Sequence, residues 1–258
     1  MEEIKLDNWE AFEGHLEKDL KKSKPSSDAL FRGHSNTNWK LETTLERFSN
    51  KRTGLSKEYS WEDYNEILGS INPTILSLTH QKFEFENYRS RHDQVPAPPP
   101  NYDFMIYLRH HGFPSPLLDW TRSPYVAAFF AFNEPTESEN VAIFSFRETL
   151  DGYKYSLTTV PHIIKIGHKA GSNRRHIQQK SEYTICFKQD SGKHFYCYHE
   201  EVEYGDKQDI LKKYLIPSKE RKKALEKLYF RDINAYSLFG SEESLMSKLA
   251  YQEIERKR

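Results

Sequence analysis

The segment PLLDWTRSPYVAAFFAF, residues 116–132, constrains the fold of this 258-residue chain most strongly, because a polar cluster interrupts an apolar run. Its first five residues have the short apolar pattern of a buried strand, and its second half has the composition of a buried helix. Between them, Ser123 and Pro124 are typical of a helix start, as N-cap and first helical residue. The segment therefore predicts a strand-to-helix turn inside the domain.

The polar residues of this turn have two explanations. The side-chain oxygens of Asp119, Thr121 and Ser123 can satisfy the free backbone N–H groups of such a turn without any ligand. A helix N-terminus is also an anion site, so a phosphate-bearing ligand explains the same residues. Capping explains neither Trp120 nor Arg122, and the residues alone do not decide between the two explanations.

Helical and strand-like patterns occupy different parts of the chain. Helices are expected over 8–21, from about 60 to about 90 with a break at Pro73, over 102–111, and from Ser218 and Ser241 onward. Strands are expected at 29–33 and at the runs VAIFSF, HIIKI, EYTICF and KHFYCYHEE. Strict alternation of strand and helix is missing, which disfavours a doubly wound nucleotide-binding fold.

The sequence therefore predicts a single α+β domain over residues 1–258, with small, mostly antiparallel sheets between N-terminal and C-terminal helices. Residues 1–27 are expected to form the N-terminal helix, and residues 91–101 a proline-rich surface loop.

Composition excludes several classes of protein. Lys plus Arg and Asp plus Glu number 38 each, so the net charge favours neither a nucleic acid nor a membrane as partner. No apolar run is long enough to span a bilayer, and the N-terminus lacks the pattern of a signal peptide, which predicts a soluble, cytoplasmic protein. Two cysteines and scattered histidines predict neither a disulfide framework nor a metal site.

The string FRGH, residues 31–34, is the first candidate for a binding site. An arginine at the end of a short strand suits bidentate contacts to phosphate, and Gly33 would let a ligand approach the backbone closely. A surface arginine beside a turn glycine is the simpler interpretation.

A second candidate lies in NRRHIQQKSEYTICF, residues 173–187, directly before a predicted strand. Its composition is typical of a solvated loop. The alternative is that Gln178, Gln179 or Glu182 faces the same pocket as Arg32.

Together these stretches resemble the FRG domain family, over about residues 28–245. The first block is Leu30 to Ser35, then Trp39 to Leu41 and Arg47; the central block is His111 to Pro114, Leu117 to Thr121, Ser123-Pro124 and Ala127 to Ala131. The third block is Arg174 with Gln178-Gln179, although Lys180 stands where glycine is usual and Tyr183 is one place late.

The three-block layout of this family is similar to that of ADP-ribosyltransferases, which implies a split β core that binds NAD as substrate. By that resemblance Arg32 clamps the pyrophosphate, the Gly33 backbone holds the nicotinamide amide, and Gln178 orients the ribose. The resemblance implies that the pocket also contains Trp120, Thr121, Ser123 and Arg174. Cleavage passes through an oxocarbenium-like state, for which Glu182 or Asp119 would supply the negative charge.

The resemblance implies an enzyme that transfers ADP-ribose to a macromolecular acceptor, protein or nucleic acid, or hydrolyses NAD, as a toxin or anti-phage effector. The alternative is a non-catalytic module that binds a nucleotide, nucleic acid or protein. A neutral glutamine in the third block and a basic helix expected over 212–231 favour this alternative. A further alternative is that the motifs determine only the fold. An active pocket requires that the three blocks converge on one cleft.

Overall fold

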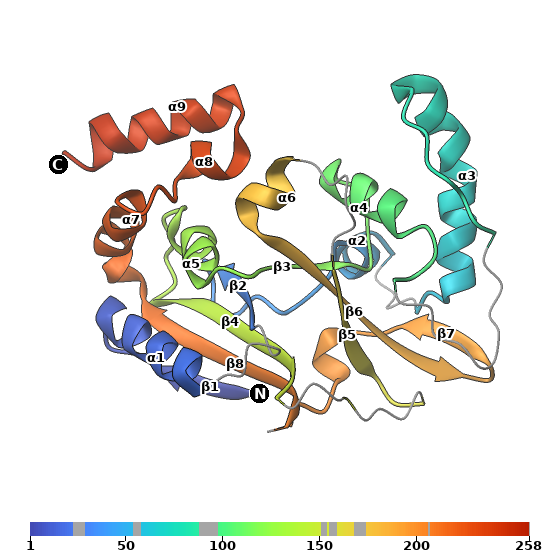
Figure 1. Ribbon diagram of the computed structural model, residues 1–258, viewed down its shortest axis with the longest axis horizontal. Coiled ribbons are helices and arrows are strands. Elements are labelled where there is room, and N and C mark those ends of the chain that lie inside the picture. The colour runs from blue at the N-terminus through green and yellow to red at the C-terminus, as the bar shows by residue number, and fades with distance from the viewer. Residues whose placement is uncertain are drawn as a thin grey trace.

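The computed structural model describes residues 1–22, 29–53, 58–87, 98–150, 154, 159–167, 174–205 and 207–257 (Figure 1). The strands are β1 (Glu2–Lys5), β2 (Leu30–His34), β3 (Leu118–Thr121), β4 (Asn140–Thr149), β5 (His162–Ile166), β6 (Ser181–Asp190), β7 (Lys193–Tyr196) and β8 (Gln208–Pro217). The α-helices are α1 (Trp9–Lys22), α2 (Thr44–Thr53), α3 (Trp61–Thr79), α4 (Tyr102–His110), α5 (Pro124–Phe132), α6 (Arg174–Gln179), α7 (Arg221–Tyr229), α8 (Ala235–Phe239) and α9 (Glu242–Ala250). Short 3₁₀ turns cover His199–Glu201 and Ser218–Glu220, and a π-helical turn covers Tyr251–Glu255.

The described strands form one eight-stranded sheet in the order β1-β8-β4-β2-β3-β6-β5, with β7 paired to β6. The β1–β8 pair is parallel and the other pairs are antiparallel. The predicted α+β class and the mostly antiparallel pairing are confirmed. The sequence had suggested several small sheets, but β2 pairs with β4 along one edge and with β3 at Phe31 on the other, which joins the strands into one sheet.

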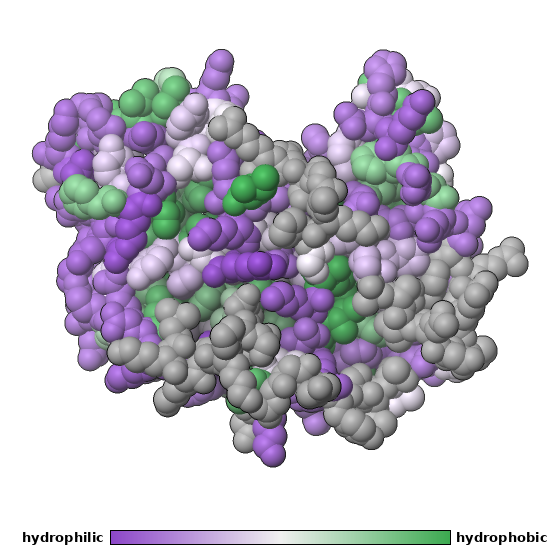
Figure 2. All heavy atoms as spheres, in the orientation of Figure 1, coloured by the Kyte–Doolittle hydropathy of each residue, from purple (hydrophilic) through white to green (hydrophobic). Residues whose placement is uncertain are grey.

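Side chains alternate along the central strands because successive residues of a strand face opposite sides of a sheet. Val141 and Ile143 of β4 pack into one core with α1, α5 and α7, whereas Ala142 and Phe144 pack into the core on the opposite face. A third core forms where α3 and α4 cover β6. Figure 1 shows one group of helices (α1, α5 and α7–α9) at one end of the sheet and a second group (α2–α4) at the other. Figure 2 shows a hollow between the part built from α8–α9 and the part built from α3.

The sheet is split in its middle. Within the described part of the chain, β2 and β3 pair at a single position, where Phe31 lies opposite Thr121. Beyond this position β2 stays paired with β4 and β3 stays paired with β6, so β2 and β3 diverge. This divergence opens a space within the sheet without breaking the main-chain pairing on either outer side.

Gly33 is required by the packing of α5 on β2. A Cβ atom at this position would lie 1.9 Å from the carbonyl oxygen of Ala127 and 2.8 Å from the backbone nitrogen of Ala131. The backbone of α5 therefore rests directly on β2. The approach of a ligand and a turn were the two interpretations of this glycine from the sequence; close contact between helix and strand explains it without either.

Several helix boundaries differ from the predictions. The N-terminal helix expected over residues 1–27 begins at Trp9, since Glu2–Lys5 form β1 and pair with β8, and the helix expected to reach about residue 90 ends at Thr79. Pro73 does not break its helix: α3 continues to Thr79 and ends at His80 in the left-handed conformation. The second half of α3 is largely exposed, so water can satisfy the carbonyl that Pro73 leaves without a donor. Ser218 does not cap α7. Its hydroxyl donates to the carbonyl of Glu139, 3.0 Å away, and a 3₁₀ turn precedes the helix.

The basic helix expected over 212–231 begins later than predicted, because residues 208–217 form β8 between β1 and β4. Lys212 forms an ion pair with Asp19, and Lys213 donates to the carbonyl of Thr37. Strand pairing on both sides thus outweighs the helical propensity of the lysines. Residues 91–97 of the expected proline-rich loop lie outside the described residues. Among those described, no helix is both long and apolar enough to cross a bilayer.

The contact at Gly33 predicts the effect of two matched substitutions. Gly33→Ala should lower the free energy of unfolding by about 3 kcal/mol, because its Cβ meets backbone atoms that cannot move independently. Gly14→Ala in α1, where nothing lies within 4 Å of the new Cβ, should raise it by about 0.5–1 kcal/mol. Urea denaturation of both variants measures the difference, and a Gly33→Ala variant as stable as the wild type would contradict the packing argument.

Candidate functional site

A cavity of about 440 Å³ lies where β2 and β3 diverge, and we call it the β2–β3 cavity. Residues from β2, β3, α2, α4, α5, α6, β6 and α8 line it: Phe31, Arg32, Gly33, His34, Ser35, Trp39, Arg47, Arg109, His110, Asp119, Trp120, Thr121, Ala127, Phe130, Arg175, Gln179, Ser181, Tyr183 and Phe239. Its volume is in the range of small-molecule sites. All three sequence blocks contribute to this one cavity.

Arg32 bridges the gap between the diverging strands. Its Nε donates to Nε2 of His34 at 2.9 Å, and its Nη1 donates to the carbonyl oxygen of Asp119 at 2.7 Å. Burial lowers the pKa of Arg32 to about 10, against the opposing charge of Asp119, so the guanidinium remains charged at neutral pH. Arg32 thus presents a fixed positive charge at the cavity wall.

His34 holds Arg32 as a neutral imidazole. Because its Nε2 accepts from Arg32, the ring proton must lie on Nδ1, which is 3.3 Å from the carbonyl oxygen of Trp39. Burial, followed by the charge of Arg32, lowers the pKa of His34 to about 3. The tautomer and the neutral state of His34 are therefore fixed by the same contact.

The cavity carries an excess of positive charge. Four lining arginines come from four elements (Arg32, Arg47, Arg109 and Arg175), and Asp119 is the one acidic residue that lines it among those described. The Asp119 carboxylate accepts a hydrogen bond from Nη2 of Arg109. Within the described residues, no ion pair involves Arg47, which is half-buried on α2. Planar guanidinium groups arranged around one cavity favour a phosphate-bearing ligand.

The third block enters the cavity through Gln179. The Thr121 hydroxyl donates to the Gln179 carbonyl at 2.6 Å, and the Gln179 amide nitrogen donates to the carbonyl of Leu238 at 3.1 Å. These bonds tie the end of α6 to β3 and α8. Gln178, which the resemblance assigned to the ribose, is not among the lining residues. Of the glutamines that the sequence left as alternatives, Gln179 is the one at the cavity.

Glu182 does not line the β2–β3 cavity either. Side chains alternate along β6, and its neighbours Ser181 and Tyr183 line the cavity, so Glu182 faces the opposite side of the sheet. It is fully buried and forms an ion pair with Arg122. This pair explains Arg122, which capping did not explain. It also leaves Asp119 as the carboxylate that a ligand in the cavity would meet.

The remaining predicted site residues have structural contacts. Ser123 caps α5 by accepting from the Val126 N–H at 3.3 Å, and Thr121 accepts from the Ser123 N–H at 3.0 Å. The Trp120 indole donates to the Thr184 hydroxyl at 2.8 Å within the core beneath the cavity. Thr121 and Trp120 also line the cavity, whereas Ser123 does not. Arg174 begins α6, but its side chain lies outside the described residues.

Arg109, His110 and Arg175 line the cavity although no sequence motif predicted them there. Arg109 and His110 occupy the last turn of α4, where basic residues are common because they interact with the helix dipole. Their sequence context therefore gave no sign of a site. Arg109 and Asp119 are ten residues apart in the sequence, and their spacing alone did not indicate that their side chains form an ion pair.

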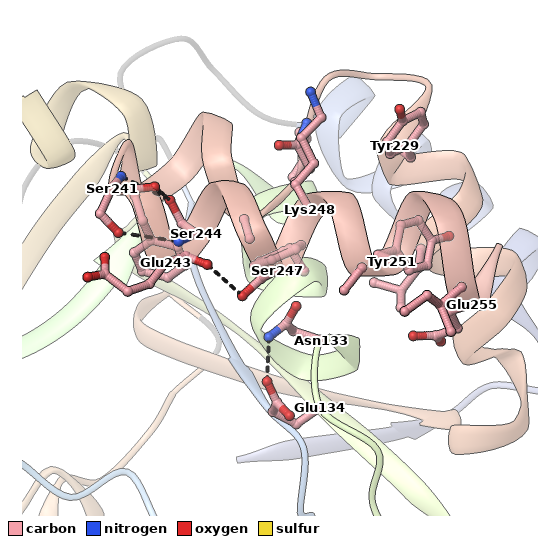
Figure 3. A pocket seen from close by; sticks show the side chains of 18 of the residues that line it. Asn133, Glu134, Tyr229, Ser241, Glu243, Ser244, Ser247, Lys248, Tyr251 and Glu255 are labelled. Carbon is pink, nitrogen blue, oxygen red and sulfur yellow. Dashed lines mark hydrogen bonds between the residues drawn. The ribbon is translucent and has the colours of Figure 1, made fainter.

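A larger crevice of about 570 Å³ separates α9 from α5 and α7 (Figure 3). Many of its polar groups are satisfied by the elements that carry them: Ser241 and Ser244 form the capping box of α9, Ser247 donates to the Glu243 carbonyl, and Asn133 donates to Glu134. Most of its lining comes from α7, α8 and α9, with Phe129 from the central block and Arg175 from α6, and the first block does not contribute to it. We call it the α9 crevice, and the β2–β3 cavity remains the candidate functional site.

A family model of the FRG domain matches residues 27–140. The match includes β2, α2, α3, α4, β3 and α5, and with them Arg32, Arg109 and Asp119. It ends at the first residue of β4, before Gln179. No curated protein and no solved structure matches the chain.

The neutral state of His34 predicts acid destabilisation. An unfolded histidine has a pKa near 6.5 and His34 in the fold about 3, so between these values the unfolded state binds more protons. Stability should therefore fall as the pH is lowered from 6.5, and this residue should contribute a slope of up to about 1.4 kcal/mol per pH unit. The His34→Gln variant can still accept from Arg32 but does not titrate. Denaturation curves across this window should show a shallower slope for the variant; an unchanged slope would contradict the assignment.

Proposed function

We propose, from the premise that residues 27–140 are an FRG domain, that this chain binds NAD in the β2–β3 cavity and cleaves its nicotinamide–ribose bond. ADP-ribose then passes to a macromolecular acceptor or to water. Depletion of NAD or modification of a cellular target by such an enzyme suits a toxin or an anti-phage effector.

The observation that carries this proposal is the meeting of three distant sequence blocks at one cavity. Arg32 comes from β2, Asp119 and Thr121 from β3, and Gln179 from the junction of α6 and β6. By analogy between folds, the similar three-block layout of ADP-ribosyltransferases supports a nucleotide in this position.

The lining residues suit the parts of NAD. The guanidinium groups of Arg32 and Arg47 can bind the pyrophosphate, since Arg47 is without an ion pair among the described residues. Phe130 and Phe239 offer apolar walls for a planar ring. Asp119 would stabilise the positive charge that develops on the ribose, and Gln179 would contact a ribose hydroxyl.

A second candidate function is binding of a nucleotide without turnover. The contact of Arg109 with Asp119 favours it, because a carboxylate already paired with a guanidinium stabilises a developing cation less well. The neutral amide of Gln179 favours it too. Nicotinamide release distinguishes the two: an enzyme produces it with every turnover, whereas a binding module retains intact NAD.

Adjacent glutamines offer a matched test of the third block. Gln179→Ala should raise the dissociation constant for NAD about tenfold by removing one contact to a hydroxyl. Gln178→Ala, one residue away on the same helix, should leave it within about twofold because Gln178 does not line the cavity. Calorimetric titration of both variants measures the difference. A larger loss for Gln178→Ala would show that the third block is assigned wrongly.

Asp119→Asn tests catalysis apart from binding. The amide keeps the size of the carboxylate but lacks its charge, so the rate of nicotinamide release should fall on the order of 10²–10³-fold while NAD still binds. The measurement is a time course of nicotinamide by chromatography, with the melting temperature as the control for folding. If wild type and Asp119→Asn both bind NAD and neither releases nicotinamide, the binding module is the correct description.

A further inference from the structure

Three polar atoms from three elements meet beside the β2–β3 cavity. They are Nε2 of His110 at the end of α4, Nε2 of His176 in α6, and the hydroxyl of Tyr183 in β6. The Tyr183 oxygen is 3.2 Å from Nε2 of His110 and 2.9 Å from Nε2 of His176, and the two Nε2 atoms contact each other. His176 and Tyr183 are buried, and His110 and Tyr183 line the cavity.

One ring nitrogen of this cluster is unprotonated and can act as a base. A ring nitrogen either donates or accepts, so contact between the two Nε2 atoms requires that one carries a proton and the other a lone pair. The Tyr183 hydroxyl also reaches the unprotonated nitrogen, so that one lone pair is shared between the N–H of the other ring and the phenol O–H. Burial lowers the pKa of His110, opposed by Asp119 of β3 and reinforced by Arg109 of α4 and Arg175 of α6. Burial also raises the pKa of Tyr183, so the phenol is neutral.

A structural role alone does not require this arrangement. Tyr102, whose ring lies 6.3 Å from that of Tyr183, shows the simpler solution for a buried tyrosine: its hydroxyl lies 3.3 Å from the backbone carbonyl of Ile166. Tyr183 instead reaches two imidazoles at the wall of an arginine-lined cavity. A phenol hydrogen-bonded to a histidine can transfer a proton without becoming a free phenolate.

We propose that His110, His176 and Tyr183 accept the proton of the nucleophile that attacks the ribose, with the Tyr183 oxygen as the atom of exchange. This inference rests on the proposed cleavage of NAD. The nucleophile would be water or an acceptor hydroxyl, which must lose a proton as it reacts.

The step balances in atoms and electrons. The bond between the ribose C1′ and the nicotinamide nitrogen breaks, and its electron pair leaves with the nicotinamide, which becomes neutral. A lone pair on the nucleophile's oxygen forms the new bond to C1′. The nucleophile's proton passes to the Tyr183 oxygen while the Tyr183 proton passes to the unprotonated Nε2, whose hydrogen bond from the other histidine breaks as the new N–H bond forms. The resulting imidazolium releases its proton to solvent through the cavity.

Two matched tyrosine variants test this inference. Tyr183→Phe removes the hydroxyl that lines the cavity, and Tyr102→Phe removes a neighbouring buried hydroxyl that does not line it. Tyr183→Phe should lower kcat for nicotinamide release on the order of 10²-fold with an unchanged Kd for NAD, and Tyr102→Phe should leave both unchanged. In the wild type kcat should fall on acidification, with a midpoint below the ordinary histidine value of 6.5. Tyr183→Phe should lose this acid limb.

The outcomes separate this inference from the proposed function. Equal kcat values for the two tyrosine variants, or an acid limb that persists in Tyr183→Phe, would overturn the relay while the NAD-cleaving function stands. A wild type that releases no nicotinamide would contradict the proposed function, and the relay with it. If Tyr183→Phe melts at a much lower temperature than Tyr102→Phe, His110→Gln at the half-buried member of the cluster replaces it. The same loss of kcat and of the acid limb is expected there.

Discussion

The single pairing of Phe31 with Thr121 determines how β2 and β3 meet and where they separate. Each strand is fully paired on its other side, β2 with β4 and β3 with β6, so the divergence does not cost the sheet its outer hydrogen bonds. The guanidinium of Arg32 replaces part of the missing ladder by donating to the Asp119 carbonyl. The cavity therefore exists because main-chain pairing between β2 and β3 stops after one position. The Arg32 guanidinium is held there by His34 and by the Asp119 carbonyl.

The contacts around the β2–β3 cavity hold two of its arginines in place. Arg32 is bound by His34 and by a backbone carbonyl, and Arg109 contacts Asp119, so these guanidinium groups are oriented before any ligand arrives. Partly buried charges that are already oriented can bind a polyanion without reorganisation of the side chains. Glu182, which the sequence left as an alternative to Asp119, instead forms an ion pair with Arg122 on the other face of the sheet. In the proposed function, the phosphates of NAD would meet the four lining arginines, and the reacting ribose would meet Asp119, the one acidic lining residue among those described.

Sequence patterns within a few residues predicted those elements that begin with a capping residue or consist of a short apolar run. The N-cap at Ser123, the strand before it and the start of α9 follow from the residues at those positions. Pairing between distant segments was not predictable in this way: residues 212–217 were assigned to a basic helix, although they belong to β8, which pairs with β1 on one edge and with β4 on the other. The same limit applied to the site. The resemblance of the combined motifs to a family was what placed Arg32 and Asp119 at one predicted pocket, whereas Gln178 and Gln179 differ only in the direction of the side chain, which α8 and β3 determine.

The most direct test of this account is a crystal structure of the chain with ADP-ribose, which contains the pyrophosphate and both ribose groups of NAD. The account predicts that the pyrophosphate lies within hydrogen-bond distance of Arg32 and Arg47, and that a ribose contacts Gln179. Density for ADP-ribose in the α9 crevice, or in the β2–β3 cavity with its phosphates away from both arginines, would contradict it.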